Sequence, residues 1–255
     1  MRTWHWLAVR TVRLGTATSG TAPRGSITTA AAPGSALVSG VALGGGAILG
    51  SGSASAAPRL DGRVVTPAMA LQRLREGNAR WASRASERRT FAPPGQAPTA
   101  GQWPFAAIVS CADSRVVPED LFDVAGKNLF ILRNAGNVVD DVTLGSLEYA
   151  ALFTGISLIV LLGHGRCGAV SATESSLASG AMPGRYIDSI VRLITPAVED
   201  LPQGHTLDEA IAANARYGAR RVQDLSSPIA AKTKAGTVGI VQAVYGLKAR
   251  EVTFF

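Results

Sequence analysis

The 255-residue sequence is poor in cysteine and in charge, and each shortage excludes a class of protein. Two cysteines are too few for a disulfide-dense scaffold or for an array of zinc modules. Charged residues make up only 17% of the chain and hydrophobic residues 47%, a balance that suits a packed globular core and excludes a disordered chain. The length fits one large domain or two small ones.

Acidic residues are missing from the first part of the chain, where none occurs before Asp61. Residues 1–56 carry four arginines, and the uncharged apolar run 36–49 precedes the small residues Ala54-Ser55-Ala56. A basic start, a short apolar run and small residues at a cleavage position are typical of an export signal. We therefore expect residues 1–56 to be a signal peptide and the protein to be periplasmic or secreted. A disordered extension or an organelle transit peptide is the alternative, with a cytoplasmic or organellar location.

The net charge of +7 suggests a nucleic-acid partner until its distribution is considered. Without residues 1–56 the chain has 21 basic and 18 acidic residues, a net charge of +3. No stripe of Lys and Arg with interleaved aromatic residues remains, so we expect no nucleic-acid surface. The run 36–49 is too short and too rich in glycine for a stable membrane span.

Residues 57–255 show strand-like and helix-like patterns in alternation, which predicts a single α/β domain with a central, mainly parallel β-sheet flanked by helices. Strands are predicted over 105–110, 128–133, 156–162, 236–244 and 252–255. Helices are predicted over 66–83, 144–153, 169–177, 186–198 and 206–225. Thr66-Pro67 and Thr206 supply N-caps for the first and last of these helices.

Chemically reactive side chains follow two of the predicted strands. Cys111, Asp113 and Arg115 come directly after strand 105–110, and His164 and Cys167 follow strand 156–162. Ligand sites in open α/β sheets form at the carboxyl ends of the strands, so we expect these side chains to converge. They include both of the chain's cysteines.

Zinc fits this set best, because thiolate and imidazole are ligands that zinc prefers. Three protein ligands leave a fourth position for water, which zinc acidifies to a pKa of about 7 and so converts to hydroxide. Two thiolates donate more negative charge than imidazoles do, so activity should favour alkaline pH. The alternatives are a Cys111–Cys167 disulfide, expected in an exported protein, and a Cys–His catalytic pair, which uses only one cysteine.

Asp113 and Arg115 add a second element beside the proposed metal. An Asp this close to zinc could occupy the fourth position and block it. Arg115 can hold the carboxylate of Asp113 by a bidentate pair and orient it as an acceptor from zinc-bound hydroxide.

Three sequence runs together resemble the β-class carbonic anhydrases: CADSRVVPEDLFDVAGKNLFILRNAGN at 111–137, SLEYA at 146–150 and VLLGHGRCGAV at 160–170. The resemblance extends from about Thr66 to Phe255 and does not cover residues 1–60. It implies one Zn²⁺ per subunit held by Cys111, His164 and Cys167, with Asp113 as a possible fourth ligand in a closed state. It also implies that Asp113 and Arg115 form the catalytic dyad.

The resemblance further implies a substrate pocket for CO2 and bicarbonate. The pocket residues would be Gln102, Phe130, Ala135, Tyr149 and the backbone of Gly168. In the family this pocket lies at a dimer interface, so Phe130 and Tyr149 are expected to act across subunits. A homodimer or homotetramer is implied, with helix 66–83 wrapping the partner.

The implied function is the reversible hydration of CO2 to bicarbonate and a proton. The first alternative is a zinc hydrolase of the same fold that acts on carbonyl sulfide or carbon disulfide. The second is a non-enzymatic protein with a disulfide or a closed structural zinc site.

Overall fold

The computed structural model describes residues 59–60, 63–86 and 101–255, so the expected signal peptide lies outside the described residues. The strands are β1 (Arg59–Leu60), β2 (Arg63–Val64), β3 (Ala106–Cys111), β4 (Leu129–Asn134), β5 (Leu158–His164), β6 (Gly239–Gly246) and β7 (Glu251–Phe254). The helices are α1 (Pro67–Ala82), α2 (Pro118–Leu121), η2 (Ala135–Asn137), α3 (Asp141–Tyr149), η3 (Ala150–Thr154), α4 (Gly168–Ser179), α5 (Ile187–Val198), α6 (Leu207–Leu225) and α7 (Ser227–Lys234).

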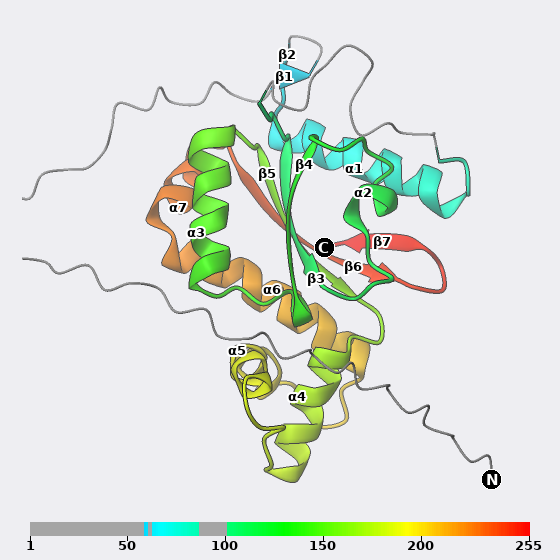
Figure 1. The fold of residues 1–255 in the computed structure, drawn as a ribbon, viewed down its shortest axis with the longest axis vertical. Helices are drawn as coiled ribbons and strands as arrows, with labels where there is room; N and C mark the ends of the chain where they lie inside the picture. The colour runs from blue at the N-terminus through cyan, green and yellow to red at the C-terminus, as the bar shows by residue number, and fades with distance from the viewer. Residues whose placement is uncertain (1–58, 61–62, 87–100) are drawn as a thin grey trace, which may run out of the picture. The chain divides into compact units, whose positions relative to one another are not determined.

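A five-stranded sheet in the order β4-β3-β5-β6-β7 forms the centre of the fold (Figure 1). The first four strands run parallel, and β7 pairs antiparallel with β6 at one edge. Every residue of β3 and β5 is buried, as expected for strands covered on both faces of a parallel sheet. The predicted α/β fold with a mainly parallel sheet is confirmed.

Helices cover both faces of the sheet and one of its ends (Figure 1). Leu74 of α1 and Leu121 of α2 join one apolar cluster with the strands, whereas Leu147 of α3 and Val222 of α6 join another on the opposite face. A third cluster contains residues of α4, α5 and α6 together with both cysteines. The helical pair α4–α5 therefore packs where β3 and β5 end.

The helix starts agree with the capping signals in the sequence. Thr66 accepts a hydrogen bond from Met69 N, and Thr206 forms a complete capping box with Glu209. The helix predicted over 144–153 instead begins at Asp141, and its last turn is the π-helix η3, which ends before Gly155 at φ 78°. The short helices α2 and α7 were not predicted, because four and eight residues give too weak a periodic pattern.

Helix α1 crosses the chain segment after α2 at Gly77. A Cβ atom added to Gly77 would lie 1.7 Å from Phe122 O, so only glycine permits this contact. We expect Gly77→Ala to lower the free energy of unfolding by about 3 kcal/mol, the upper end of the usual cost of overpacking. Urea denaturation of the zinc-loaded protein measures this change.

Gly145 in α3 provides the comparison, since within its own chain a Cβ atom there would meet no atom within 4 Å. Gly145→Ala should stabilise the protein by up to about 1 kcal/mol, because alanine favours the helix. A Gly77→Ala protein as stable as the wild type would contradict the close packing of α1.

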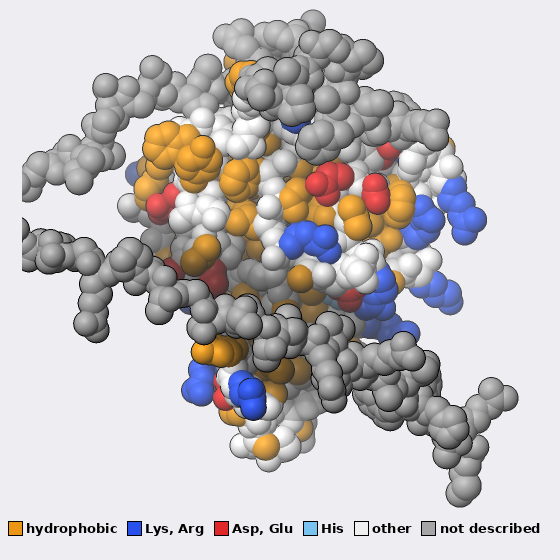
Figure 2. Space-filling model, viewed as in Figure 1, with side chains coloured by type: hydrophobic (Ala, Val, Ile, Leu, Met, Phe, Trp, Pro, Cys, Tyr) orange, Lys and Arg blue, Asp and Glu red, His pale blue; other side chains and the backbone are white. Residues whose placement is uncertain are grey.

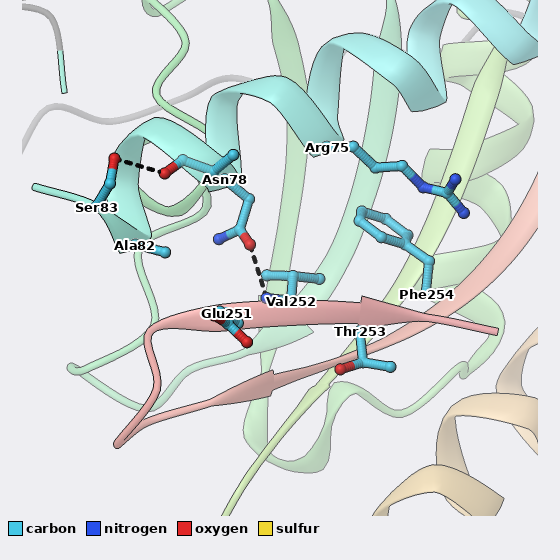
Figure 3. A pocket seen from close by; sticks show the side chains of 9 residues that line it. Arg75, Asn78, Ala82, Ser83, Glu251, Val252, Thr253 and Phe254 are labelled. Carbon is cyan, nitrogen blue, oxygen red and sulfur yellow. Dashed lines mark hydrogen bonds between the residues drawn. The ribbon is translucent and has the colours of Figure 1, made fainter. Parts of the chain in front are cut away.

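The side chain of Asn78 in α1 is hydrogen-bonded to the backbone at the start of β7 (Figure 3). Its Nδ2 donates to Arg250 O at 3.2 Å and to Leu121 O at 3.0 Å, and its Oδ1 accepts from Val252 N at 2.8 Å. The amide of Asn78 thus pairs with the strand as a peptide group would. The helix predicted over 66–83 is confirmed, and its wrapping of a partner stays a prediction.

Apolar side chains also reach the surface, and in Figure 2 they gather over the upper end of α3. Tyr149 at the end of α3 and Phe153 in η3 are exposed by 51% and 56%, and Val142 at the start of α3 is exposed by 77%. Within residues 59–60, 63–86 and 101–255, no helix combines the length and the apolar character that crossing a membrane requires.

Candidate metal centre

Three donor side chains meet at the carboxyl ends of two neighbouring strands. Cys111 is the last residue of β3, His164 is the last residue of β5, and Cys167 directly precedes α4. Their ligand atoms all lie within 4.8 Å of one another, and all three residues are buried. Both cysteines are free thiols, so the structure does not form the alternative disulfide.

His164 is oriented for metal binding by its backbone neighbour. Its Nδ1 lies 3.0 Å from Gly165 O, and because a carbonyl only accepts, Nδ1 carries the proton. The other ring nitrogen, Nε2, is buried without a hydrogen-bond partner. An unpaired buried nitrogen is costly unless it binds a metal, so His164 fits the role of a zinc ligand.

The two cysteines shift each other's pKa in opposite directions. A hydrogen bond from Cys167 lowers the pKa of Cys111 well below its ordinary value, with further lowering by His164 and Gly136 N and opposition from burial. Donation of that hydrogen bond, together with burial, raises the pKa of Cys167. For His164, burial lowers the pKa, but the contact with the Cys111 thiolate outweighs it, and the net pKa is raised. Two cysteine sulfurs and an imidazole nitrogen in this contact form a donor set that Zn²⁺ can bind, and binding would release any remaining thiol proton.

Asp113 lies beside the donor atoms and is held by Arg115. Arg115 donates from Nε to Oδ1 at 2.9 Å and from Nη2 to Oδ2 at 2.6 Å, and its backbone N also donates to Oδ1 at 2.9 Å. These bonds hold the pKa of Asp113 far below its usual value, so the carboxylate is ionised at neutral pH. Oδ2 is 3.9 Å from the unpaired Nε2 of His164, which places a fixed acceptor next to the metal-binding atoms.

Arg133 supports the loop that carries this carboxylate, and the sequence reasoning assigned it no role. Its Nη2 donates to Asp113 O at 2.8 Å, and its Nε donates to Cys111 O at 3.2 Å. Arg133 stands in β4 directly opposite Ser110 of β3. The one signal in the sequence was its place near the carboxyl end of a predicted apolar strand.

Ala135 and Gly168 lie at the same edge of the sheet as the cluster. Ala135 begins η2 directly after Asn134, which pairs with Cys111, and Gly168 begins α4 directly after Cys167. A Cβ atom added to Gly168 would meet nothing within 4 Å, so open space lies in front of its backbone. Both positions are suited to contact a molecule bound at the metal.

Gln102, Phe130 and Tyr149 lie away from the cluster of their own chain. Phe130 pairs with Ala107, four residues before Cys111, or about 13 Å along the strand. The ring of Tyr149 packs against Phe130 with 6.3 Å between ring centroids. Gln102 is exposed and precedes the amino end of β3, whereas Cys111 ends that strand. One chain alone does not complete the expected pocket.

The chain is similar in sequence to known proteins of one enzyme family. The family model described as carbonic anhydrase matches residues 106–252. A carbonic anhydrase of Mycolicibacterium smegmatis is 37% identical over 190 residues, which cover 71% of this chain and 89% of that protein. Carbonic anhydrase 2 of Mycobacterium tuberculosis is 34% identical over 193 residues, with the same coverage.

Solved structures of low sequence identity share the fold. A Coccomyxa β-carbonic anhydrase is superimposed with a TM-score of 0.54 at 21% identity, over 72% of this chain and 80% of that one. A tetrameric β-carbonic anhydrase of Sordaria macrospora gives a TM-score of 0.55 at 19% identity, over 61% and 82%. With the fold, the Cys-His-Cys cluster and the family match in agreement, the chain belongs to the β-class carbonic anhydrases.

Proposed function

We propose that this protein catalyses the reversible hydration of CO2 to bicarbonate and a proton, with one zinc ion per subunit held by Cys111, His164 and Cys167. The observation that supports this most is the buried Cys-His-Cys cluster beside an ionised carboxylate. When bound, zinc supplies the activation of a water molecule for attack on CO2, and two thiolate ligands shift that activation toward alkaline pH.

The chain's own residues orient the reactants. Asp113 remains ionised because Arg115 holds it, and an ionised carboxylate at this place accepts a hydrogen bond from the attacking water and so directs its lone pair at CO2. Arg133 fixes the backbone on both sides of Ala112, which limits the freedom of that carboxylate. The backbone of Gly168, at the start of α4, has open space in front of it and would bind an oxygen of the substrate.

A direct test is stopped-flow CO2 hydration by the full-length, zinc-loaded protein between about pH 6.5 and about pH 9. The proposal predicts hydration that rises toward alkaline pH. Zinc-loaded protein without hydration at any pH would refute it, and hydrolysis of carbonyl sulfide or carbon disulfide in its place would assign the site to that substrate class.

We propose that a second copy of the chain supplies Gln102, Phe130 and Tyr149 to each site. The exposed rings of Tyr149 and Phe153 form an aromatic cluster with the half-buried ring of Phe130, with 6.3 Å and 5.4 Å between successive ring centroids, and such a surface favours burial against a partner. The Sordaria macrospora proteins are described as tetrameric, which supports a homodimer or homotetramer for this chain.

Mixed dimers test this arrangement. In the proposed arrangement, Gln102→Ala damages the site of the partner chain, whereas Asp113→Ala damages the site of the chain that carries it. In a dimer of one Gln102→Ala chain and one Asp113→Ala chain, both substitutions therefore affect the same site, and the other site is intact. Random mixing should therefore restore about a quarter of wild-type activity, because half of the dimers are mixed and each has one working site. If each chain used its own Gln102, mixing would restore nothing.

We also propose that residues 1–56 direct export to the periplasm or the medium, on the strength of their composition alone. Mass spectrometry of the protein in cell fractions tests this. An exported chain that begins near Ala57 is expected, and an intact chain confined to the cytoplasm would contradict it.

A further inference from the structure

The loop that follows β4 contacts a zinc-ligating thiol through its backbone. Gly136 N donates to Cys111 Sγ at 3.4 Å. The carbonyl of the same residue accepts a hydrogen bond from Asn214 Nδ2 at 2.8 Å. Asn214 of α6 thus binds the carbonyl oxygen of Gly136, while the N–H of Gly136 donates to the sulfur of Cys111.

Asn214 occupies a position where an apolar residue would be expected. Ile211 and Gly218 lie three residues before it and four after it on α6, and both pack against β5 or its neighbours. Asn214 is only 3% exposed, so its amide has been removed from water. A buried amide destabilises a fold unless it is hydrogen-bonded, and the Asn214 amide donates to Gly136 O.

Gly136 has little freedom to move. Its φ is 77°, a region that favours glycine, and an added Cβ atom would lie 2.8 Å from Ile194 Cδ1 and 3.0 Å from Ala169 Cβ. The rest of the loop is fastened as well, since Asn134 Oδ1 accepts from Val138 N at 2.8 Å. The hydrogen bond from Asn214 is one of the restraints on Gly136, and it is the one that ties this residue to α6.

We infer that Asn214 is a positioning residue of the metal centre, which through Gly136 keeps a backbone N–H directed at the Cys111 sulfur. A hydrogen bond to a zinc-bound sulfur fixes its place and withdraws negative charge from it, and partners of metal ligands commonly alter metal affinity tenfold or more. The inference rests on the proposed zinc function, because it assigns Asn214 an effect on that ion.

The test compares Asn214→Ala with Asn78→Ala. Asn78 is also a buried asparagine, 5% exposed, whose amide donates to backbone carbonyls. It is a residue of α1 that contacts β7 and has no contact with the loop that carries Gly136 among its hydrogen bonds (Figure 3). Both variants should lose stability in urea denaturation. Only Asn214→Ala should bind zinc about tenfold more weakly in competition with a chelator. Its cobalt-substituted form should absorb at longer wavelength in the sulfur-to-cobalt band, because a thiolate without its N–H donor is easier to oxidise.

Asn214→Leu keeps the branched shape of the side chain with somewhat larger end groups and suits the apolar face of α6, so it is the second variant if Asn214→Ala does not fold. It should show the same loss of zinc affinity and the same spectral shift. Equal zinc affinity in wild type, Asn78→Ala and either Asn214 variant would overturn the inference. Since neither readout involves CO2, a protein that binds zinc but does not hydrate CO2 would refute the proposed function and still allow this test.

Discussion

Replacing Cys167 with Ser is expected to remove zinc from the protein and to lower CO2 hydration by about a thousandfold or more. The Cys167 side chain is buried and its sulfur lies within 4.8 Å of the other two donor atoms. A serine hydroxyl is a poor zinc ligand, and two remaining ligands hold the ion weakly. Metal analysis and stopped-flow hydration on the same preparation measure both losses.

The two histidines in the described part of the chain provide a matched pair for the same prediction. His164→Ala should also remove zinc, because its unpaired Nε2 faces the two sulfurs. His205→Ala removes hydrogen bonds to Glu174 and to Pro202 O, away from the cluster, and should keep zinc and activity. Full zinc content in Cys167→Ser or His164→Ala would place the metal elsewhere.

The second large effect is expected from Asp113→Asn, which should leave zinc bound and lower hydration about a hundredfold or more. The amide keeps the shape of the side chain, but it loses the ionised oxygens that Arg115 holds at 2.6 Å and 2.9 Å. An amide N–H directed at the attacking water would also donate where an acceptor is needed. The measurements are zinc content and the hydration rate at saturating CO2.

Asp188→Asn is the control for this substitution. Asp188 forms an ion pair with Arg192 at 4.0 Å on α5, outside the cluster, so this variant should hydrate CO2 at nearly the wild-type rate. Arg115→Lys should give an intermediate loss, because lysine cannot form the bidentate pair. A zinc-loaded Asp113→Asn protein with wild-type turnover would remove Asp113 from the mechanism.

The sequence predicted the metal cluster because its geometry follows from strand order. Cys111 and His164 each end an apolar strand, and parallel strands bring their carboxyl ends to one edge. The spacing of His164 and Cys167 then requires only a short turn into a helix. These relations are local, so residue patterns are enough to establish them.

Other parts of the centre depend on contacts that no local pattern contains. Asn214 reaches Gly136 across 78 positions of sequence, and Arg133 reaches Asp113 across 20. A polar residue in the apolar stripe of helix 206–225 was the only available signal for Asn214. Gln102 and Tyr149 are separated from the cluster of their own chain, and the role proposed for them across subunits needs a second chain that sequence patterns cannot place.

The measurement that tests the account most directly is zinc K-edge X-ray absorption of the full-length protein active in CO2 hydration. The account predicts two sulfur ligands at about 2.3 Å and lighter nitrogen or oxygen ligands at about 2.0 Å, of which one is imidazole. Active protein without zinc, or zinc without sulfur ligands, would contradict the assignment of Cys111, His164 and Cys167.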